Sequence, residues 1–237
     1  MSISTQYRTE APEIMDDFAM EGEILSDALD KIASINQLLG GNSITIDGIK
    51  ILLDEKDKAV VYKIIDIGCG NGDMLRKIAD FGIENNFNFQ LKGIDANQYT
   101  INYAKKLSDL YPNIAYSCVN IFDKSFDNLT YDIALLTLTL HHFSEDEILS
   151  LLEKINKMSK IGIVINDLQR SKVAYRLFQI LAKVCRLNKM SKEDGLVSIL
   201  RGFTNQDLIS YATKLNFTNY KIKWKWAFRY QWIISKT

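Results

Sequence analysis

The sequence contains few residues that cross-link, bend or divide a chain. Among its 237 residues are only three cysteines, two prolines and two histidines. An odd number of cysteines without metal-ligand spacing argues against a disulfide framework and a zinc cluster, and it suits a reducing compartment. Pro12 and Pro112 cannot form a proline-rich linker. We therefore expect one cytoplasmic domain with additions, and no bound metal.

Long apolar runs and an excess of one charge are also missing. The chain has 29 basic and 29 acidic residues, so no global charge points to nucleic acid as a partner. No apolar run approaches the length of a membrane span, and the polar N-terminus lacks a signal core. Hydrophobic residues make up 47% of the chain, which is ordinary for a globular protein with a substantial core.

The charges are unevenly placed along the chain. The first quarter is acidic and the last third is basic. Two interpretations stay open: two solvated surfaces that attract each other across the fold, or a basic mouth for an anionic substrate or a membrane surface.

One stretch organises the rest of the chain. Residues 60–67 are mostly β-branched and apolar, which predicts a strand covered on both faces. Gly68, Gly70 and Gly72 follow at alternate positions, and residues 73–85 then show helical spacing. A strand, a glycine turn and a helix N-terminus together form a site for a nucleotide-like ligand.

From residue 60 onward the sequence alternates between predicted strands and helices. Further strands are expected at 89–95, 114–119, 131–138 and 161–165, and helices at 98–110 and 144–158. The alternating segment 220–226 and the candidate strand 228–235 are too close for a parallel crossover, so they must pair antiparallel. This order predicts an α/β fold with a mostly parallel sheet, helices on both faces and an antiparallel final pair.

The N-terminal part follows a different pattern. Apolar residues recur at helical spacing over 12–39, with a division at Gly22. Residues 42–58 are ambiguous, and a short strand at 44–46 and a helical turn at 48–53 are both compatible with them. We expect an N-terminal helical arm or lid (1–58) and a ligand-binding domain (59–237) with a helical insertion at about 168–203.

The glycine spacing argues against a pyrophosphate ligand. The dinucleotide fingerprint has its third glycine three residues after the second, but here Gly72 comes one position early and Asp73 follows it. A carboxylate at the helix start would repel a pyrophosphate, which disfavours NAD, FAD and ATP. Asp95, at the end of the next predicted strand, is placed to bind ribose hydroxyls. These features favour an adenosine-like ligand with a cationic or zwitterionic part and no phosphate.

These motifs resemble those of the class I S-adenosylmethionine-dependent methyltransferases. Residues 66–72 are similar to the first motif of that family, and residues 93–96 to the second. Residues 131–133 and 140–143 resemble the fourth strand and following loop of its ubiquinone-biosynthesis-like, small-molecule branch. The resemblance implies a seven-stranded, doubly wound, Rossmann-like sheet that holds S-adenosylmethionine across its C-terminal strand ends. Asn120 departs from the family, which often has Asp at this position.

The resemblance also implies roles for individual residues. Gly68 and Gly70 would let the backbone approach the amino-acid part of the donor. Asp66 would face the donor's ammonium group, or alternatively cap the turn, and Asp95 would bind the ribose hydroxyls. The implied cofactor-binding residues are Asp66, Gly68, Cys69, Gly70, Asp95, Ala96, Asn120, Ile121 and Thr137.

The two histidines are the first candidates for catalysis. His141 and His142 follow the C-terminal end of the fourth predicted strand, and histidine accepts a proton near neutral pH. We prefer His142 as a general base, with His141 as the second choice. The alternative is that one histidine caps the helix at Ser144 and the other packs. Asp167, at the end of the fifth strand, is the third candidate, with a turn or cap as its alternative.

We therefore predict an S-adenosylmethionine-dependent methyltransferase that acts on a small apolar or aromatic metabolite, with O-methylation preferred. The acceptor is expected to be lipid-like or aromatic. No nucleic-acid partner and no integral membrane segment are expected, and the oligomeric state stays open. Two alternatives remain: a catalytically silent S-adenosylmethionine-binding protein and an NAD-dependent oxidoreductase.

Overall fold

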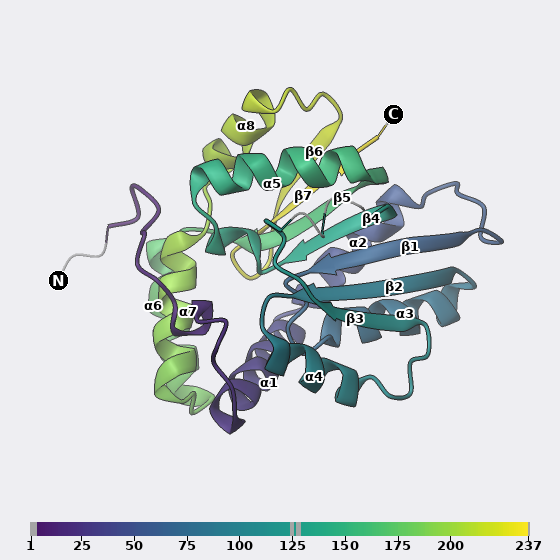
Figure 1. Cartoon of the computed structure of the whole chain (residues 1–237). Helices are drawn as coiled ribbons and strands as arrows, with labels where there is room; N and C mark the ends of the chain where they lie inside the picture. Colours follow the sequence, from purple (N-terminus) through teal and green to yellow (C-terminus); the bar gives the residue numbers. More distant parts are fainter. Residues whose placement is uncertain (1–3, 124–125, 127–128, 237) are drawn as a thin grey trace.

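The fold is built on a seven-stranded sheet in the order β3-β2-β1-β4-β5-β7-β6 (Figure 1). The structure is a computed structural model that describes residues 4–123, 126 and 129–236. Strands β1 to β5 pair in parallel, whereas β7 is antiparallel to both β5 and β6. The strands are β1 (Val61–Ile67), β2 (Asn88–Asp95), β3 (Ile114–Cys118), β4 (Tyr131–Thr137), β5 (Ser159–Leu168), β6 (Tyr220–Lys225) and β7 (Arg229–Ser235). The predicted fold class is confirmed.

Helices lie on both faces of this sheet and beyond the ends of its strands (Figure 1). They are η1 (Ile14–Asp16), α1 (Glu23–Leu38), α2 (Gly41–Leu52), α3 (Asp73–Asn85), α4 (Gln98–Leu107), η3 (Leu140–His142), α5 (Glu145–Met158), α6 (Lys172–Val184), α7 (Lys189–Arg201) and α8 (Asn205–Lys214). Two apolar clusters hold the layers together: one contains side chains of α2, α3 and α4, and the other those of α5 and α8. In Figure 1, α1, α6 and α7 gather beyond the ends of the strands.

Alternation along each strand explains the two clusters. Successive side chains of a strand point to opposite faces of the sheet. In β1, Ile64 packs in the cluster with α3, whereas Ile65 and Ile67 pack in the cluster with α5. Because helices cover both faces, all three side chains are buried.

Reciprocal hydrogen bonds cap the predicted helix start at Ser144 and also the start of α8 at Thr204. The Ser144 backbone N–H donates to Glu147 Oε2 at 2.8 Å, and the Glu147 N–H donates back to Ser144 Oγ at 3.4 Å. Thr204 and Asp207 form the same reciprocal pair, so aspartate replaces the usual glutamate without loss of the cap. The N-cap of α5 is therefore Ser144 itself, and the expectation that a histidine caps this helix is wrong.

Of the two alternatives left open for residues 42–58, the helical one is present and the strand is not. Residues 44–46 do not form a strand, because they lie inside α2. This helix packs directly on β5: a Cβ on Gly48 would lie 2.5 Å from Val164 Cγ1. Its close fit to the sheet is a tertiary contact that local sequence cannot show. The region of the expected helical insertion, at about 168–203, contains two helices, α6 and α7. None of the helices in the described part of the chain combines the length and hydropathy of a membrane span.

The contact between Gly48 and Val164 makes a testable prediction for stability. Gly48→Ala places a methyl group against Val164, and we expect the free energy of unfolding to fall by about 1–2 kcal/mol because the core is overpacked. In a Val164→Ala background the same change should be neutral or stabilising, since alanine has the higher helix propensity. Urea unfolding of the four proteins measures both values. An equal cost in both backgrounds would contradict the packing argument.

Candidate functional site

A cavity of about 910 Å³ lies at the C-terminal ends of β1, β2, β4 and β5. Four parts of the chain line it: the glycine turn after β1, the segments that follow β2, β3 and β4, helices α1, α6 and α7, and the N-terminal segment around η1. Residues that are far apart in the sequence therefore face one enclosed space. Its wall includes all nine residues predicted to bind the cofactor, and both histidines.

The glycine turn is shaped by contacts that only glycine permits. Gly68, Gly70 and Gly72 have φ values of 70°, 52° and 77°, which L side chains rarely adopt. A Cβ on Gly68 would lie 2.6 Å from Thr139 Cγ2, and one on Gly72 would overlap the Tyr116 hydroxyl. Gly72 thus lets α3 pack against β3. Gly68 and Gly70 remain at the cavity wall, where their backbone is open to a ligand.

Asp95 ties the end of β2 to this turn. Its carboxylate accepts hydrogen bonds from the Gly70 N–H at 3.2 Å and from the Asn97 N–H at 3.0 Å. Burial raises the pKa of Asp95, and these backbone bonds partly offset that effect. Each carboxylate oxygen has a further lone pair, so Asp95 can also accept hydrogen bonds from ligand hydroxyls.

Asp66 is a buried carboxylate that lacks compensation. It is 2% exposed, and its Oδ1 has no hydrogen-bond partner. Burial raises its pKa well above the ordinary value, and the negative charges of Asp73 and Asp95 add to this effect. An uncompensated carboxylate is costly in a protein interior. The arrangement fits a ligand that brings a cationic group to this side chain, as an α-ammonium group would.

The other predicted cofactor residues have local roles as well. Asn120 is exposed, and its Oδ1 accepts the Phe122 N–H at 3.0 Å, which shapes the turn after β3. The Thr137 hydroxyl pairs with the Thr45 hydroxyl of α2 at 3.0 Å. Ile121 is buried at the cavity wall. Cys69 and Ala96 also line the cavity. The cofactor roles of these residues stay predictions.

His141 is held by Asp167. The two side chains meet at 2.7 Å between His141 Nδ1 and Asp167 Oδ1, and the His141 N–H donates to Asp167 Oδ2 at 3.2 Å. Burial alone would raise the pKa of Asp167, but the charge and hydrogen bond of His141 lower it. Asp167 does not itself line the cavity. It lies behind His141 and orients the ring, so these two predicted residues form a pair.

His142 is held by a different acid, from the N-terminal segment. Its Nδ1 lies 2.8 Å from Asp16 Oδ1, and Arg201 Nη1 donates to Asp16 Oδ2 at 2.6 Å. Burial would raise the pKa of Asp16, but hydrogen bonds from His142, the Glu13 backbone and Arg201 lower it. The Arg201–Asp16 pair joins the basic C-terminal part of the chain to its acidic beginning.

Glu13 completes this cluster, and it was absent from the sequence-based candidates. Its Oε1 lies 3.6 Å from His141 Nε2 and 3.9 Å from His142 Nδ1. Neither Glu13 Oε1 nor His141 Nε2 has a hydrogen-bond partner. Burial raises the pKa of Glu13 to about 7. Only the acidic composition of the first quarter of the chain hinted at this residue.

The same three side chains have the composition of a metal site. Their ligand atoms lie within 4.8 Å of one another, and two histidines with one carboxylate can bind a divalent transition metal. The sequence favoured no metal, and that expectation stays a prediction.

The N-terminal segment is fixed over the cavity by backbone contacts. Asp194 of α7 accepts the N–H groups of Ile14 at 2.7 Å and Met15 at 3.1 Å. Arg8 Nη2 donates to the carbonyl oxygens of His141 and Phe143, both at 2.9 Å. These bonds place Glu13 against the histidines. Whether the segment moves as a lid stays a prediction.

Known proteins resemble this chain over the domain that contains the glycine turn. Residues 64–162 match the methyltransferase domain family. Des-methyl DIF-1 methyltransferase A of Dictyostelium discoideum is 29% identical over 122 residues, which make up 50% of this chain. The match spans 33% of that protein's own length, so it covers one part of the relative.

Solved structures extend the likeness over nearly the whole chain. The plantazolicin methyltransferase BpumL in complex with SAH has a TM-score of 0.66 at 20% identity, with 90% of this chain and 89% of that chain covered. An O-methyltransferase family protein from Burkholderia thailandensis has a TM-score of 0.65 at 15% identity, with 97% and 65% covered. At such identities the likeness concerns the fold.

The pKa of Glu13 predicts how stability depends on pH. Its value is about 7 in the folded protein against an ordinary 4.5, so the folded state holds a proton that the unfolded state releases between these values. Stability is therefore lost as the pH rises through this range. Glu13→Gln removes the loss, and the variant should gain about 2–3 kcal/mol on the wild type between pH 5 and pH 8.

Urea unfolding at the two pH values tests this expectation. Glu10 is exposed, so Glu10→Gln is the matched control and should keep the same difference from wild type at both pH values. A stability difference for Glu13→Gln that does not change with pH would show that the carboxyl group is not buried as described.

Proposed function

We propose that this chain is a class I S-adenosylmethionine-dependent methyltransferase that methylates a small-molecule acceptor, a proposal that its domain match and its fold support. The observation that carries the proposal is a single cavity that joins the glycine turn and Asp95 to His141. Bound S-adenosylmethionine supplies an activated methyl group and leaves as a neutral thioether, so the site needs no acid for the leaving group. The ubiquinone-biosynthesis-like branch stays a prediction.

The donor end of the cavity contains the groups that S-adenosylmethionine requires. The uncompensated Asp66 carboxylate suits the ammonium group, and the open backbone of Gly68 and Gly70 lies beside it in the turn. Asp95 keeps lone pairs for the ribose hydroxyls, and Ile121 offers an apolar surface to the adenine. The relative BpumL was solved with SAH, the product of the same donor.

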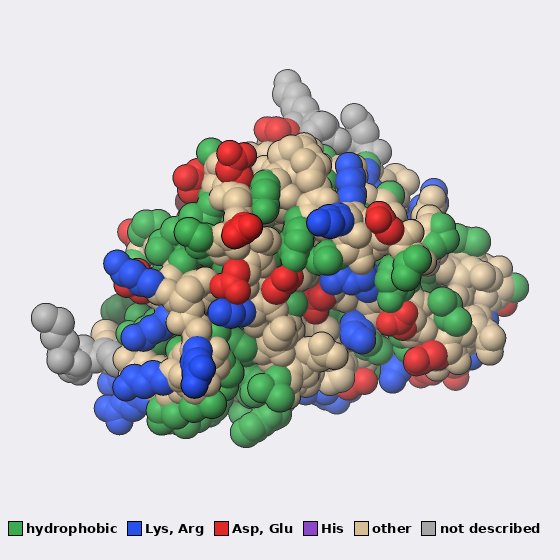
Figure 2. Space-filling view, turned by 90° about the horizontal axis from the view of Figure 1, so that it is seen from below, with side chains coloured by type: hydrophobic (Ala, Val, Ile, Leu, Met, Phe, Trp, Pro, Cys, Tyr) green, Lys and Arg blue, Asp and Glu red, His purple; other side chains and the backbone are tan. Residues whose placement is uncertain are grey.

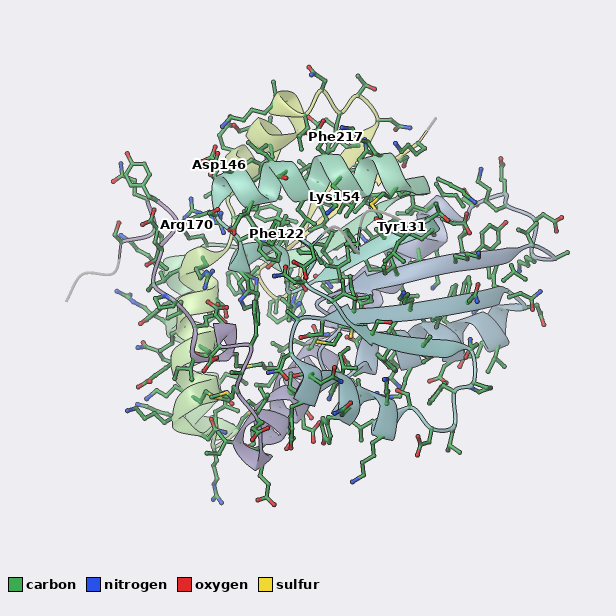
Figure 3. All side chains as sticks on the ribbon, in the orientation of Figure 1. Phe122, Tyr131, Asp146, Lys154, Arg170 and Phe217 are labelled. Atoms are coloured by element: carbon green, nitrogen blue, oxygen red, sulfur yellow. The ribbon has the colours of Figure 1, made fainter. Side chains whose placement is uncertain are left out.

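The acceptor end of the cavity is apolar. Leu177, Ile180 and Val184 of α6 line it, and they are also 48%, 60% and 73% exposed, so they form its rim. Figure 2 shows hydrophobic side chains exposed next to lysine and arginine side chains on the face seen from below. Phe122, labelled in Figure 3, lies on the opposite wall after β3. An apolar rim favours a lipid-like or aromatic acceptor.

The geometry favours His141 as the base for an oxygen nucleophile. Asp167 accepts the proton of Nδ1, which leaves the lone pair of Nε2, a buried atom without a hydrogen-bond partner, free to accept a proton. The acceptor hydroxyl gives its proton to His141 Nε2 while its oxygen bonds to the methyl carbon and the carbon–sulfur bond breaks. Glu13, 3.6 Å from Nε2, would stabilise the imidazolium that results. His142, the choice preferred from sequence, binds Asp16 through its Nδ1 in the same way, so the two histidines are distinguished by the variants described below.

Methyl transfer requires that water be kept from the reacting groups, and the overlying segments contribute to this. The N-terminal segment and α7 cover the histidines through the Asp194 and Arg201 contacts.

The two other functions considered are tested by binding and turnover. Tight binding of NADH without binding of S-adenosylhomocysteine would favour an oxidoreductase. Tight binding of S-adenosylhomocysteine without turnover on any acceptor would favour a silent binding protein.

Asp95 provides the test of the donor site. We expect Asp95→Ala to weaken S-adenosylhomocysteine binding by about 10- to 100-fold, because hydrogen bonds to a charged group are lost. Calorimetry measures the affinity, and thermal unfolding shows whether the fold is kept. Asp109→Ala, an exposed position after α4, is the control and should bind normally. Unchanged affinity in a folded Asp95→Ala variant would refute the ribose assignment.

The base is tested by comparing the two histidines. We expect His141→Gln to lower the rate of S-adenosylhomocysteine formation about 100-fold or more, with donor affinity changed less than about threefold. His142→Gln should lose less than about tenfold. A panel of phenols, quinol-like compounds and fatty acids serves as acceptors. A larger loss in His142→Gln would assign the base to that residue.

The same assay distinguishes a base from a metal ligand. Activity should survive dialysis against a chelator if His141 acts as a free base. Activity that disappears on dialysis and returns with added zinc would instead assign Glu13, His141 and His142 to a metal site.

A further inference from the structure

We propose that Arg229, the first residue of β7, and the N-terminus of α2 form an anion site in the cavity wall that binds a carboxylate group of a bound ligand. The carboxylate belongs either to the amino-acid part of the donor or to the acceptor. The inference rests on the proposed function for the identity of the donor, and it names a ligand group that the proposed reaction leaves undefined.

Arg229 is a buried cation without a partner. Its side chain belongs to a residue that is 3% exposed, and both Nε and Nη1 lack a hydrogen-bond partner. Within the described residues, no carboxylate lies close enough to form an ion pair with it. A buried guanidinium with unpaired donors is costly unless an anion reaches it. Because Arg229 lines the cavity, a ligand can supply that anion.

The acid whose charge acts on Arg229 already has other hydrogen-bond partners. The charge of Asp167 raises the pKa of Arg229, but burial has the larger effect and lowers the value to about 10. The Asp167 oxygens accept hydrogen bonds from His141 Nδ1, from the His141 backbone and from the Leu168 backbone. The Asp167 oxygens therefore bind His141 and the backbone, and Arg229 Nε and Nη1 remain without a hydrogen-bond partner.

The N-terminus of α2 adds a second positive feature at the same place. A Cβ on Gly41, the first residue of this helix, would lie 3.1 Å from Arg229 Cζ and would overlap Asn36 Oδ1. The N-cap Gly40 contributes no side-chain hydrogen bond. A helix N-terminus carries partial positive charge, so a cation next to it is unfavourable without an anion. Asn36 Oδ1 also lacks a partner, and a neutral amide cannot balance this charge.

The place of this anion site explains why two ligands can supply the carboxylate. At the start of α2, Asn42 Nδ2 donates a hydrogen bond to Asp73 Oδ2 at 3.0 Å. Asp73 is the first residue of α3 and directly follows the glycine turn. Asp167, whose charge acts on Arg229, forms a hydrogen bond with His141 at the acceptor end. Arg229 therefore lies between the donor end and the acceptor end. A guanidinium fork binds a carboxylate with two parallel hydrogen bonds.

The donor arm of the test uses calorimetry on the full chain. Two probes are titrated into wild type and Arg229→Gln: S-adenosylhomocysteine and its decarboxylated analogue. If the site takes the donor carboxylate, Arg229→Gln weakens S-adenosylhomocysteine binding at least tenfold and leaves the affinity for the analogue unchanged.

The acceptor arm is run with S-adenosylhomocysteine at saturation. Benzoate and benzyl alcohol are titrated into both proteins. If the site takes an acceptor carboxylate, wild type binds benzoate at least tenfold more tightly than benzyl alcohol, Arg229→Gln loses this preference, and S-adenosylhomocysteine binds both proteins equally. The proposal is overturned if Arg229→Gln changes neither arm. If wild type fails to bind S-adenosylhomocysteine, the proposed function itself is refuted.

A merely structural arginine would behave differently. Arg170, labelled in Figure 3, is also buried, but its Nη1 donates to the Gly202 carbonyl at 2.6 Å and lies 3.0 Å from Asp207 Oδ2. Arg170→Gln should lower the unfolding temperature. Arg229→Gln should keep or raise it without ligand, because it removes an uncompensated cation. A lowered unfolding temperature with equal loss for all four probes would overturn the proposal.

A second substitution keeps the test decisive if Arg229→Gln does not fold. Arg229→Lys keeps the charge but loses the guanidinium fork. Its affinity for the carboxylate-bearing probe of one arm, S-adenosylhomocysteine or benzoate, should fall at least threefold. Its affinity for the other probes should stay unchanged. Wild-type affinity for all probes would overturn the proposal.

Discussion

Parallel pairing of β1, β2, β4 and β5 brings the carboxyl ends of four strands to one edge of the sheet, and the candidate site depends on this register. Asp66 pairs with Gly93 across β1 and β2, and Thr137 pairs with Asn166 across β4 and β5. The residues that follow each strand are consequently neighbours, although long stretches of sequence separate them. The antiparallel β7 then adds Arg229 at the same edge, because its start pairs with the end of β5.

The same edge concentrates charge away from water. Asp66, Glu13 and Arg229 each present a buried polar atom without a hydrogen-bond partner. Burial raises the pKa of both acids and lowers that of the arginine, because a charged group loses its solvation there. Such groups are costly in a ligand-free protein, and they become favourable when a zwitterionic ligand supplies the missing partners. The site is therefore preorganised for charge that the chain itself does not provide.

The cover of the cavity comes from both ends of the chain. The N-terminal segment brings Glu13 and Asp16 to the two histidines, and Asp194 and Arg201 of α7 hold that segment in place. The acidic beginning and the basic C-terminal part thus do attract each other across the fold. The charged pairs around His142 also position the two histidines.

The sequence by itself determined the strands, the glycine turn and the position of Asp95 at the end of β2. Their signals are local: β-branched runs, alternation, glycine spacing and an acid at a strand end all act within a few residues. The sequence left a strand at 44–46 and a helical turn at 48–53 both open, whereas in the structure α2 packs on Val164 there. Only the tertiary structure paired His141 with Asp167 and brought Glu13 and Arg229 to the cavity. These contacts join distant parts of the chain, and burial, which sets their charge state, exists only after folding.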